Sequence, residues 1–437
     1  MKSSASFLCL SLWLFLGGLN AQKMAKIDVL HYQASVEPTL VDKSIKGQVT
    51  IRFRVLGKAS QIIAFNCGSL QVDQVTIDNQ AVPYQTEKKR LLITLSPHHI
   101  TQAEIEVNIQ YQGYPKQGIV FFPDSREVTT VFSTSQWLVC KDAIDDKATL
   151  DMEIVAPADL QVVSNGQLIS KKKLDQQKTA HHWQQAEAVP SYIFGFAVGP
   201  FQETIKTQND ISFHYLSRTH DEAVLGQIFK ETPQMMAFFA EKAGVPYPLA
   251  TYTQVLMQGN ISQEMAGFTV MRASYGKNVL AKEEAVNLSA HELAHQWWGN
   301  QVTCVNWRHF WLNEGLAVFM STAYRESRWG RAAYQADIKV YYDAYQKVVN
   351  KGKDKALVFP NWNNPTGDDR VLVYYKGAYF FHLLKEELGD EVFWKALRVY
   401  TQTYYGKSVE TKDLQTIFEQ VSQQDLKPLF DKWVYKK

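Results

Sequence analysis

The sequence predicts an α+β protein in which an all-β part precedes a mainly helical part. Short runs of alternating apolar and polar residues fill the first half of the 437-residue chain, and apolar residues with helical spacing fill the second half. The period changes near residue 221, so strands and helices occupy separate parts of the chain. With 46% hydrophobic and 21% charged residues, the composition is that of an ordinary globular protein.

Residues 1–21 are predicted to be a signal peptide that is removed from the mature chain. Lys2 supplies a positive charge, an apolar run of about 13 residues follows, and Ala21 ends the segment. The run is shorter than the roughly 20 residues that span a bilayer, and no other stretch of the sequence is apolar enough to cross one. We therefore expect export to the periplasm or the extracellular space, and no membrane span in the mature chain. Membrane anchoring is the weaker alternative.

Residues 22–204 are predicted to form the N-terminal β domain. Turn signals such as Asp78-Asn79 and Asn165-Gly166 separate short alternating runs, and no helical pattern comes between them. Many evenly spaced strands of this kind favour an antiparallel sandwich or a saddle-shaped sheet. The clearest predicted strands are 47–55, 91–95, 103–111, 148–156 and 191–199.

Residues 205–437 are predicted to form a mainly helical domain. Its segments carry apolar residues at i, i+3 and i+4, and several of them end in glycine, which commonly terminates helices. The predicted helices are 222–244, 283–299, 314–330, 370–389 and 413–422.

Charge and cysteine content exclude several classes of protein. The net charge is +2, with 46 Lys and Arg against 44 Asp and Glu, so the chain lacks the basic excess that binds nucleic acid. After removal of residues 1–21, Cys67, Cys140 and Cys304 allow at most one disulfide. The apolar core must therefore stabilise the fold, whereas small secreted proteins rich in cysteine depend on disulfides.

The motif His291-Glu292-x-x-His295 predicts a metal site in the helical part. The i, i+4 spacing places both imidazoles on one helix face, where they can bind one zinc ion. Glu314, 19 residues after His295 at the start of the next predicted helix, supplies a third ligand. Glu292 then lies beside the metal and can act as general base toward a metal-activated water. The pair His181-His182, in contrast, is expected in exposed, polar surroundings.

The sequence around these residues resembles the aminopeptidase N family of gluzincin metallopeptidases. HELAHQWWGN (291–300) and WLNEG (311–315) match the zinc signature of that family, with the same spacing between the two segments. The resemblance extends to GQVTIRF and SNGQL in the β part, to WLVCKDAIDDKAT, where Val139 replaces the usual proline, and to VLVYYKGA (371–378). It implies a thermolysin-like catalytic domain after the β domain, and one zinc ion per chain.

The resemblance also assigns roles to Tyr374, Glu264 and Gly267. Tyr374, in the Tyr-x-Lys-Gly register, corresponds to the phenol that donates a hydrogen bond to the developing oxyanion, with the neighbouring Tyr375 as a rival. Glu264 corresponds to the carboxylate that binds the free α-amine of the substrate, and Gly267 keeps the family's register in this substrate-binding stretch. The other family residues of the stretch, in 261–265, are replaced. A carboxylate that faces a protonated amine forms a charge-assisted hydrogen bond, which the interior of a peptide cannot supply.

Together these residues predict a zinc-dependent aminopeptidase that hydrolyses the N-terminal residue from peptides with a free N-terminus. Three alternatives stay open: a zinc endopeptidase with the same ligands, another hydrolase on the same scaffold, such as an epoxide-opening enzyme, and a non-catalytic, zinc-stabilised binding protein. Larger members of the family continue into a helical C-terminal domain, which this sequence lacks, so a more open cleft is expected. Self-association stays an open possibility.

Overall fold

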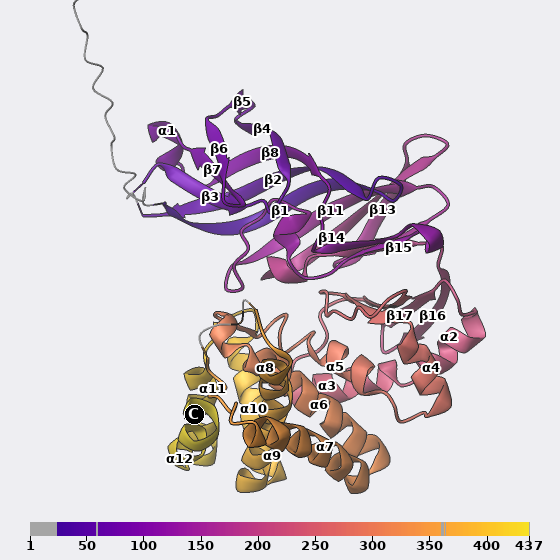
Figure 1. Cartoon of the computed structure of the whole chain (residues 1–437), viewed down its shortest axis with the longest axis vertical. Helices are drawn as coiled ribbons and strands as arrows, with labels where there is room; N and C mark the ends of the chain where they lie inside the picture. The colour runs from indigo at the N-terminus through magenta and orange to yellow at the C-terminus, as the bar shows by residue number, and fades with distance from the viewer. Residues whose placement is uncertain (1–23, 58–59, 360–361, 363, 437) are drawn as a thin grey trace, which may run out of the picture.

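The computed structural model describes residues 24–57, 60–359, 362 and 364–436. The predicted signal peptide, residues 1–21, lies outside the described residues. The strands of the N-terminal part lie at one end of the molecule, and the helices lie at the other (Figure 1). This arrangement confirms the predicted fold class.

A large mixed sheet forms the body of the N-terminal part. In spatial order its strands are β13 (Gln167–Lys173), β14 (Lys178–Pro190), β11 (Lys147–Pro157), β1 (Lys26–Thr39), β2 (Ser44–Leu56), β8 (Ile105–Gly113), β4 (Gln71–Ile77) and β5 (Gln80–Ala81). Neighbouring strands are antiparallel, except that β1 and β11 are parallel. Strands β1 and β11 alternate buried and less buried residues, the pattern of a sheet with one face on the core.

Two smaller sheets complete the N-terminal part. One contains β12 (Gln161–Ser164), β15 (Phe196–Gly199), β10 (Glu127–Thr130) and β9 (Ile119–Phe122), and the other contains β3 (Ile62–Asn66), β7 (Arg90–Thr94) and β6 (Tyr84–Glu87). The helix α1 (Pro97–Ile100) and the 3-10 turns η1 (Pro123–Ser125), η2 (Thr134–Gln136) and η3 (Ser191–Ile193) connect strands.

The predicted strand 191–199 extends only from Phe196 to Gly199, because its first residues form the turn η3. The Asn165 side chain explains the change. Its amide donates to the carbonyl of Ile193 at 2.9 Å and accepts from the amide of Gly195 at 2.7 Å, so these backbone groups have a side-chain partner in place of a neighbouring strand. The prediction for His181 was also wrong: this residue lies on β14 and is 3% exposed.

A mixed sheet opens the second part of the chain. Its strands are, in order, β16 (Gln202–Gln208), β17 (Ile211–Ser217), β18 (Thr251–Met257) and β19 (Phe268–Arg272). Strands β17, β18 and β19 are parallel, and β16 pairs antiparallel with β17. The predicted domain boundary at residue 204 falls inside β16, whose pairing assigns it to the second part.

Helices make up most of the second part. They are α2 (Glu222–Ile228), α3 (Thr232–Ala243), α4 (Ser274–Ala281), α5 (Asn287–Ala294), α6 (Trp311–Trp329), α7 (Arg331–Asn350), α8 (Gly367–Val371), α9 (Gly377–Leu388), α10 (Asp390–Tyr404), α11 (Thr411–Ser422) and α12 (Lys427–Phe430). Shorter elements are the strands β20 (Thr303–Cys304) and β21 (Ser408–Val409), the 3-10 turn η4 (Trp307–His309) and the π-helical segments η5 (Leu372–Lys376) and η6 (Asp431–Tyr435).

The observed helices differ from the predicted ones at specific breaks. The predicted helix 222–244 is divided into α2 and α3, and Pro233 lies in the first turn of α3, where its missing amide costs nothing. The predicted helix 283–299 is shorter, because α5 ends at Ala294. The predicted helix 370–389 contains the π-helical segment η5 before α9.

Two glycines allow helices α6 and α9 to cross at close range. A Cβ atom added to Gly315 would lie 2.9 Å from Cα of Gly377, and one added to Gly377 would lie 3.0 Å from Cα of Gly315. The first contact is shorter than Cβ atoms show in folded proteins, and the second would require the neighbouring backbone to shift, so the close crossing depends on glycine at both positions. The crossing places Glu314, which precedes Gly315, next to the segment η5 that precedes α9.

The two parts share one apolar core and several buried hydrogen bonds. Gln263 accepts from the amide of Phe132 at 2.6 Å and donates to the carbonyl of Tyr192 at 3.1 Å. Asn165 donates to the carbonyl of Ala266 at 3.0 Å. These bonds attach the 263–266 stretch of the second part to the N-terminal part.

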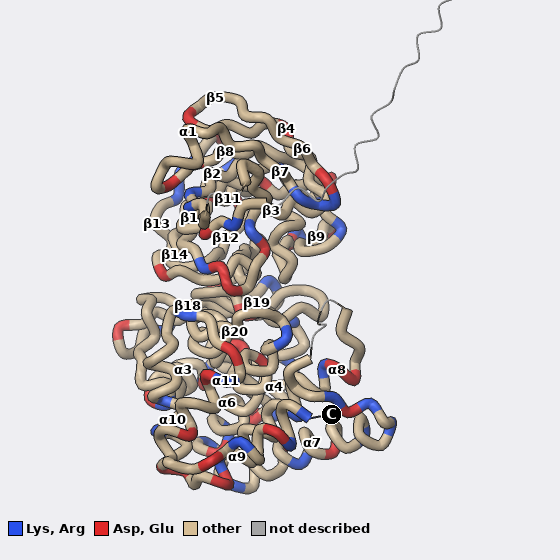
Figure 2. The backbone as a smooth tube through the Cα atoms, turned by 90° about the vertical axis from the view of Figure 1, so that its left-hand side faces the viewer, with Lys and Arg blue, Asp and Glu red and all other residues tan. Residues whose placement is uncertain are grey.

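Three further observations bear on the sequence predictions. The cysteines Cys67, Cys140 and Cys304 are all buried and free. Acidic and basic residues are interspersed over both parts, as the composition led us to expect (Figure 2). Among the described residues, we find no helix whose length and apolar character would allow it to span a bilayer.

Candidate metal centre and active site

Helices α5 and α6 bring His291, His295 and Glu314 together. His291 lies in the last turn of α5, His295 caps that helix, and Glu314 lies in the first turn of α6. The two Nε2 atoms are 3.1 Å apart, and Oε2 of Glu314 lies 3.3 Å from Nε2 of His291 and 3.4 Å from Nε2 of His295. The predicted ligand set therefore converges on one point.

These three side chains fit a zinc ion. Ligand atoms at ~2.0–2.1 Å from a tetrahedral centre lie about 3.3–3.4 Å from one another, which is close to the spacing observed here. Oε2 of Glu314 has no hydrogen-bond donor among the described residues, although Glu314 is only 2% exposed. Two histidines and one glutamate are also a donor set of catalytic zinc sites, in which the fourth position stays open.

A backbone carbonyl orients His295. Nδ1 of His295 donates to the carbonyl of Trp298 at 2.9 Å, which leaves Nε2 as the metal-binding atom. This carbonyl belongs to Trp298, whose own Nε1 donates to Thr401 at 2.9 Å. The neighbouring Trp297 is fixed by a hydrogen bond from its Nε1 to the carbonyl of Val245 at 2.8 Å. The tryptophan pair that follows the histidine motif therefore stabilises the ligand geometry.

The buried charges of the site favour a cation at the point where the ligands meet. Burial lowers the pKa of His295, but the carboxylates of Glu314, Glu264 and Glu292 outweigh burial and raise this pKa to about 10. Burial raises the pKa of Glu314, but His295 and His291 outweigh burial and lower it to about 2. The carboxylates thus stabilise positive charge at this point, which a divalent cation would supply.

Glu292 lies in the same pocket but outside the ligand triad. The pocket has a volume of 500 Å³ and is lined by the triad together with Glu292, Glu264 and Tyr374. Burial, followed by the nearby carboxylates of Glu264 and Glu314, raises the pKa of Glu292 well above its usual value. A carboxylate with a raised pKa is a stronger base, which suits a residue that accepts a proton and later returns it.

Tyr374 reaches the site from the π-helical segment η5. Its ring lies 6.0 Å from the ring of His291, at an interplanar angle of 26°. Burial, and then the carboxylates of Glu314 and Glu264, raises the pKa of Tyr374 well above 10, so the phenol keeps its proton at neutral pH. The rival Tyr375 also lines the pocket, but its ring stacks on Tyr341 at 5.0 Å. This geometry favours Tyr374 as the donor.

Lys376, two residues after Tyr374, anchors the segment η5. Lys376 is 1% exposed, and its ammonium donates to Asp354 at 2.7 Å and to the carbonyl of Lys355 at 2.7 Å. Gly377 then crosses α6 at Gly315. The Tyr-x-Lys-Gly pattern is therefore explained residue by residue: a phenol in the pocket, a buried anchor and a helix crossing.

Glu264 enters the pocket from the loop between β18 and β19. It is 3% exposed, and its Oε1 has no hydrogen-bond partner among the described residues. Burial, the largest cause, raises its pKa to about 7; His295 lowers it, and Glu314 raises it further. A buried carboxylate without a donor lacks the compensation that burial normally requires, so this position is prepared for a positively charged group.

Gly267 shapes this loop from behind the pocket and does not line it. Its φ is +84°, and an added Cβ would lie 2.9 Å from the amide of Gly166 in the N-terminal part. Its own amide donates to Oε1 of Gln296 at 3.0 Å, and Nε2 of Gln296 donates to the carbonyl of Met265 at 3.0 Å. The observed contacts of Gly267 are thus structural, and its direct contact with substrate stays a prediction.

Sequence reasoning missed several residues that line the pocket. Among them are Phe132 from the N-terminal part, Arg272 at the end of β19, and Asp337 on α7. Asp337 accepts from the side-chain amide of Asn287 at 3.1 Å and so connects α7 to the first residue of α5. One signal was available for Arg272, since ligand sites gather at the carboxyl ends of parallel strands. The other two follow no local motif.

Two family profiles match the chain. The Peptidase family M1 domain matches residues 228–433, which contain all three predicted metal ligands. The Peptidase M1 N-terminal domain matches residues 29–193. The matched ranges follow the order of the two parts in the structure.

The similar proteins of known function include fungal aminopeptidases. Leucine aminopeptidase 2 of Emericella nidulans is 27% identical over 318 residues, which are 68% of this chain and 50% of that protein. Leucine aminopeptidase 2 of Aspergillus oryzae is 25% identical over 462 residues, covering 93% of this chain and 70% of that protein. The chain thus spans between about half and two thirds of the length of these relatives.

Solved structures of similar fold cover nearly the whole chain. An M1 zinc metallopeptidase mutant from Deinococcus radiodurans, bound to a Tyr-Ser-Ala substrate, has a TM-score of 0.79 at 22% identity and covers 93% of this chain and 94% of that chain. Native yeast LTA4 hydrolase has a TM-score of 0.82 at 20% identity and covers 94% of this chain but 68% of that chain.

We expect removal of the metal to lower the melting temperature by about 10 °C, because buried carboxylates would lose their cation. Differential scanning fluorimetry before and after dialysis against a chelator measures this change, and elemental analysis measures zinc. Addition of stoichiometric zinc should restore the original melting temperature. An unchanged melting temperature in protein shown to be metal-free would contradict the assignment of this site.

Proposed function

Because the chain belongs to peptidase family M1, we propose that it is a zinc-dependent aminopeptidase, which removes the N-terminal residue from peptides. The observation that carries this proposal is the position of Glu264. Its buried carboxylate, with Oε1 unpartnered among the described residues, lines the same pocket as the metal ligands and Glu292. The α-ammonium of a peptide N-terminus is the group that such a carboxylate binds.

Electrostatics explain why the site would select chain ends. An α-ammonium next to Glu264 would supply the positive charge that the buried carboxylate lacks. The interior of a peptide carries no charge at the corresponding position, so its binding would leave Glu264 buried and unpaired. The difference favours substrates with a free N-terminus.

The metal ligands, Glu292 and Tyr374 would perform three distinct parts of the hydrolysis. A zinc ion held by His291, His295 and Glu314 would supply Lewis acidity, which polarises a carbonyl and acidifies water. Glu292 would accept the proton of the attacking water and pass it to the departing amine. The phenol of Tyr374 would donate a hydrogen bond to the oxygen that gains negative charge, since its raised pKa keeps it protonated.

The alternatives have less support. A zinc endopeptidase would need the same ligands but has no use for an unpaired carboxylate at Glu264. A non-catalytic binding protein would need neither the general base Glu292 nor the donor Tyr374. A different hydrolase on this scaffold, such as an epoxide-opening enzyme, would share the fold of yeast LTA4 hydrolase, and a fold alone does not determine chemistry.

We also infer that the enzyme is exported and acts in the periplasm or outside the cell. The support is the sequence of residues 1–21, with a positive start, an apolar run and a small residue at its end. The intact mass of protein recovered from its natural compartment tests this inference, because cleavage would make Gln22 the first residue.

Replacement of Glu292 by glutamine is expected to lower kcat by about 10²- to 10⁴-fold, because it removes the base and keeps the shape of the side chain. The zinc content should stay unchanged, since Glu292 lies outside the ligand triad. Hydrolysis of aminoacyl-coumarin amides gives kcat, and elemental analysis gives zinc. The matched control is Glu283→Gln, an exposed residue paired with Lys230, which should keep wild-type activity. A wild-type kcat for E292Q would exclude Glu292 as the base.

Replacement of Glu264 by glutamine is expected to lower kcat/KM for free-amine substrates by about 10- to 100-fold, because the charge-assisted bond to the α-ammonium is lost. N-acetylated forms of the same amides are the matched control, and the wild-type enzyme should hardly cleave them. If the variant retains the wild-type preference for free over acetylated amides, another group binds the amine. Rapid wild-type cleavage of the acetylated amides would instead favour an endopeptidase.

A further inference from the structure

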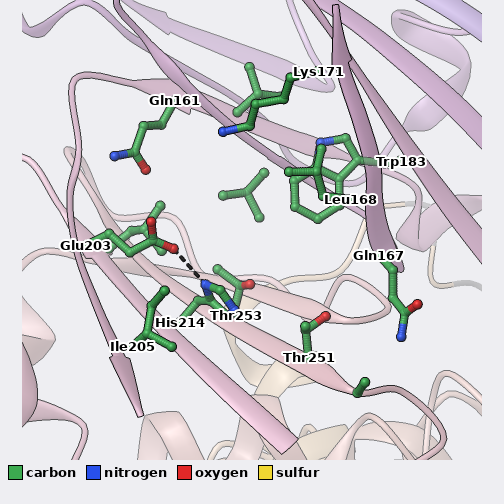
Figure 3. A pocket seen from close by; sticks show the side chains of 14 residues that line it. Gln161, Gln167, Leu168, Lys171, Trp183, Glu203, Ile205, His214, Thr251 and Thr253 are labelled. Atoms are coloured by element: carbon green, nitrogen blue, oxygen red, sulfur yellow. Dashed lines mark hydrogen bonds and ion pairs between the residues drawn. The ribbon is translucent and has the colours of Figure 1, made fainter. Parts of the chain in front are cut away.

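A second pocket lies between the two parts of the protein, away from the metal centre. It has a volume of 350 Å³. One wall consists of residues from β12, β13 and β14 of the N-terminal part, and the other consists of residues from β16, β17 and β18 (Figure 3). Pockets of about 300–1,000 Å³ at domain interfaces are common sites for small molecules.

The sheet of the second part separates this pocket from the active site. Thr251 and Thr253 of β18 line the pocket. The next strand position after Thr253 has the opposite orientation: Gln254 donates to Ser289 of α5, the helix that carries His291, at 2.8 Å. The pocket and the metal centre thus lie on opposite faces of one sheet.

Two hydrogen-bond donors of the pocket have no acceptor among the residues that the structure describes. Lys171 of β13 forms no ion pair with any residue that the structure describes, whereas the nearby Lys178 and His182 pair with acidic residues. Nε1 of Trp183 is buried and has no partner among the described residues, and the side chain is only 8% exposed. Both groups can only donate, so a ligand that pairs with them must supply a hydrogen-bond acceptor or an anion.

The charge of Lys171 contributes to the lowered pKa of a buried histidine, His181. Lys171 pairs in register with the buried His181 of β14, two residues before Trp183. Burial, and then the charge of Lys171, lowers the pKa of His181 to about 4, so that histidine is neutral at physiological pH. Lys171 forms no ion pair with an acid of this strand pair among the described residues.

The acid that lines the pocket already has a hydrogen-bond partner. Oε1 of Glu203 lies 2.6 Å from Nδ1 of His214, and Figure 3 shows this pair across the pocket from Lys171. Gln161, beside the pair, donates to the carbonyl of Phe201 at 2.9 Å. The carboxylate of Glu203 therefore has a partner, whereas Lys171 and Nε1 of Trp183 have no acceptor among the described residues.

Apolar groups form the rest of the lining. The Trp183 ring and Leu168 lie next to each other in Figure 3, and they pair in register across β13 and β14. Leu168 is 40% exposed, and Ile205, on the opposite wall, is 55% exposed. Such exposure of large apolar side chains beside a pocket marks a surface that a ligand can cover.

We propose that this interdomain pocket binds a small carboxylate with an apolar body, such as an N-blocked or free aliphatic amino acid or the C-terminal residue of a peptide. The carboxylate accepts from Lys171 and from Nε1 of Trp183, and the apolar body packs against Leu168 and Ile205. The site is independent of the catalytic chemistry proposed above, since it shares no residue with the metal pocket.

Isothermal titration calorimetry with N-acetyl-L-leucine tests the proposal. The acetyl group removes the amine that Glu264 would bind, so the probe discriminates against the active site. We expect one site in the wild-type protein, about tenfold or more weaker binding in Lys171→Met, and weaker binding in Trp183→Phe. Lys172→Met is the matched control, because its side chain lies on the opposite face of the same strand, and it should bind like the wild type.

Two results would overturn the proposal. One is no binding of N-acetyl-L-leucine to the wild-type protein up to about 10 mM. The other is equal binding by wild type and K171M, which would place the probe elsewhere, for example on the metal. N-acetyl-L-leucinamide, which lacks the carboxylate, should not bind.

The same titration identifies the source of the carboxylate. Equal binding of N-acetyl-Gly-Gly-Leu would support peptide C-termini as ligands, and weaker binding would support small free acids. K171M should retain wild-type hydrolysis of aminoacyl-coumarin amides, so failure of this proposal is distinguishable from failure of the aminopeptidase assignment.

Discussion

The concentration of negative charge at the metal centre is the constraint on which the rest of the structure depends. Glu264, Glu292 and Glu314 are 3%, 5% and 2% exposed and line one pocket. Three buried carboxylates repel one another and have lost most of their water, so the arrangement is stable only around positive charge. A metal ion on His291 and His295 would pair with Glu314, and the α-ammonium of a bound substrate would pair with Glu264. Metal binding and the proposed binding of a substrate amine would therefore both compensate buried negative charge.

Helix packing is what keeps these groups at the right distances. Gly315 and Gly377 bring α6 and α9 so close that Glu314, before the first glycine, and Tyr374, before the second, lie at one point. The π-helical segment η5 carries Tyr374, and the hydrogen bond from the buried Lys376 to Asp354 attaches that segment to the residues before α8. Glu314 and Tyr374 are 60 residues apart in the sequence, and the contact between Gly315 and Gly377 brings them together. A change at either glycine would therefore displace Glu314 and Tyr374 together.

What could be predicted from the sequence was local. The i, i+4 spacing placed His291 and His295 correctly, because helix geometry alone determines which residues share a face. Helix ends were less predictable: α5 ends at Ala294 because His295 and the following tryptophans form bonds outside the helix. Phe132 could not be predicted, since it reaches the pocket through a fold contact between residues far apart in the chain. The exposure expected for His181 failed for a similar reason, because strand pairing with β11 and β13 buried it.

The loop that carries Glu264 shows why the N-terminal part is more than an accessory. The family residues around Glu264 are replaced, yet the carboxylate still lines the pocket. Gln263 holds the loop to the backbone of Phe132 and Tyr192, and Asn165 holds it at Ala266. Each of these partners belongs to the N-terminal part, so that part positions Glu264, while α5 positions the two histidines of the proposed metal site. The carboxylate proposed to bind the substrate amine is therefore positioned where the two parts meet, and selection of a free N-terminus would require both parts.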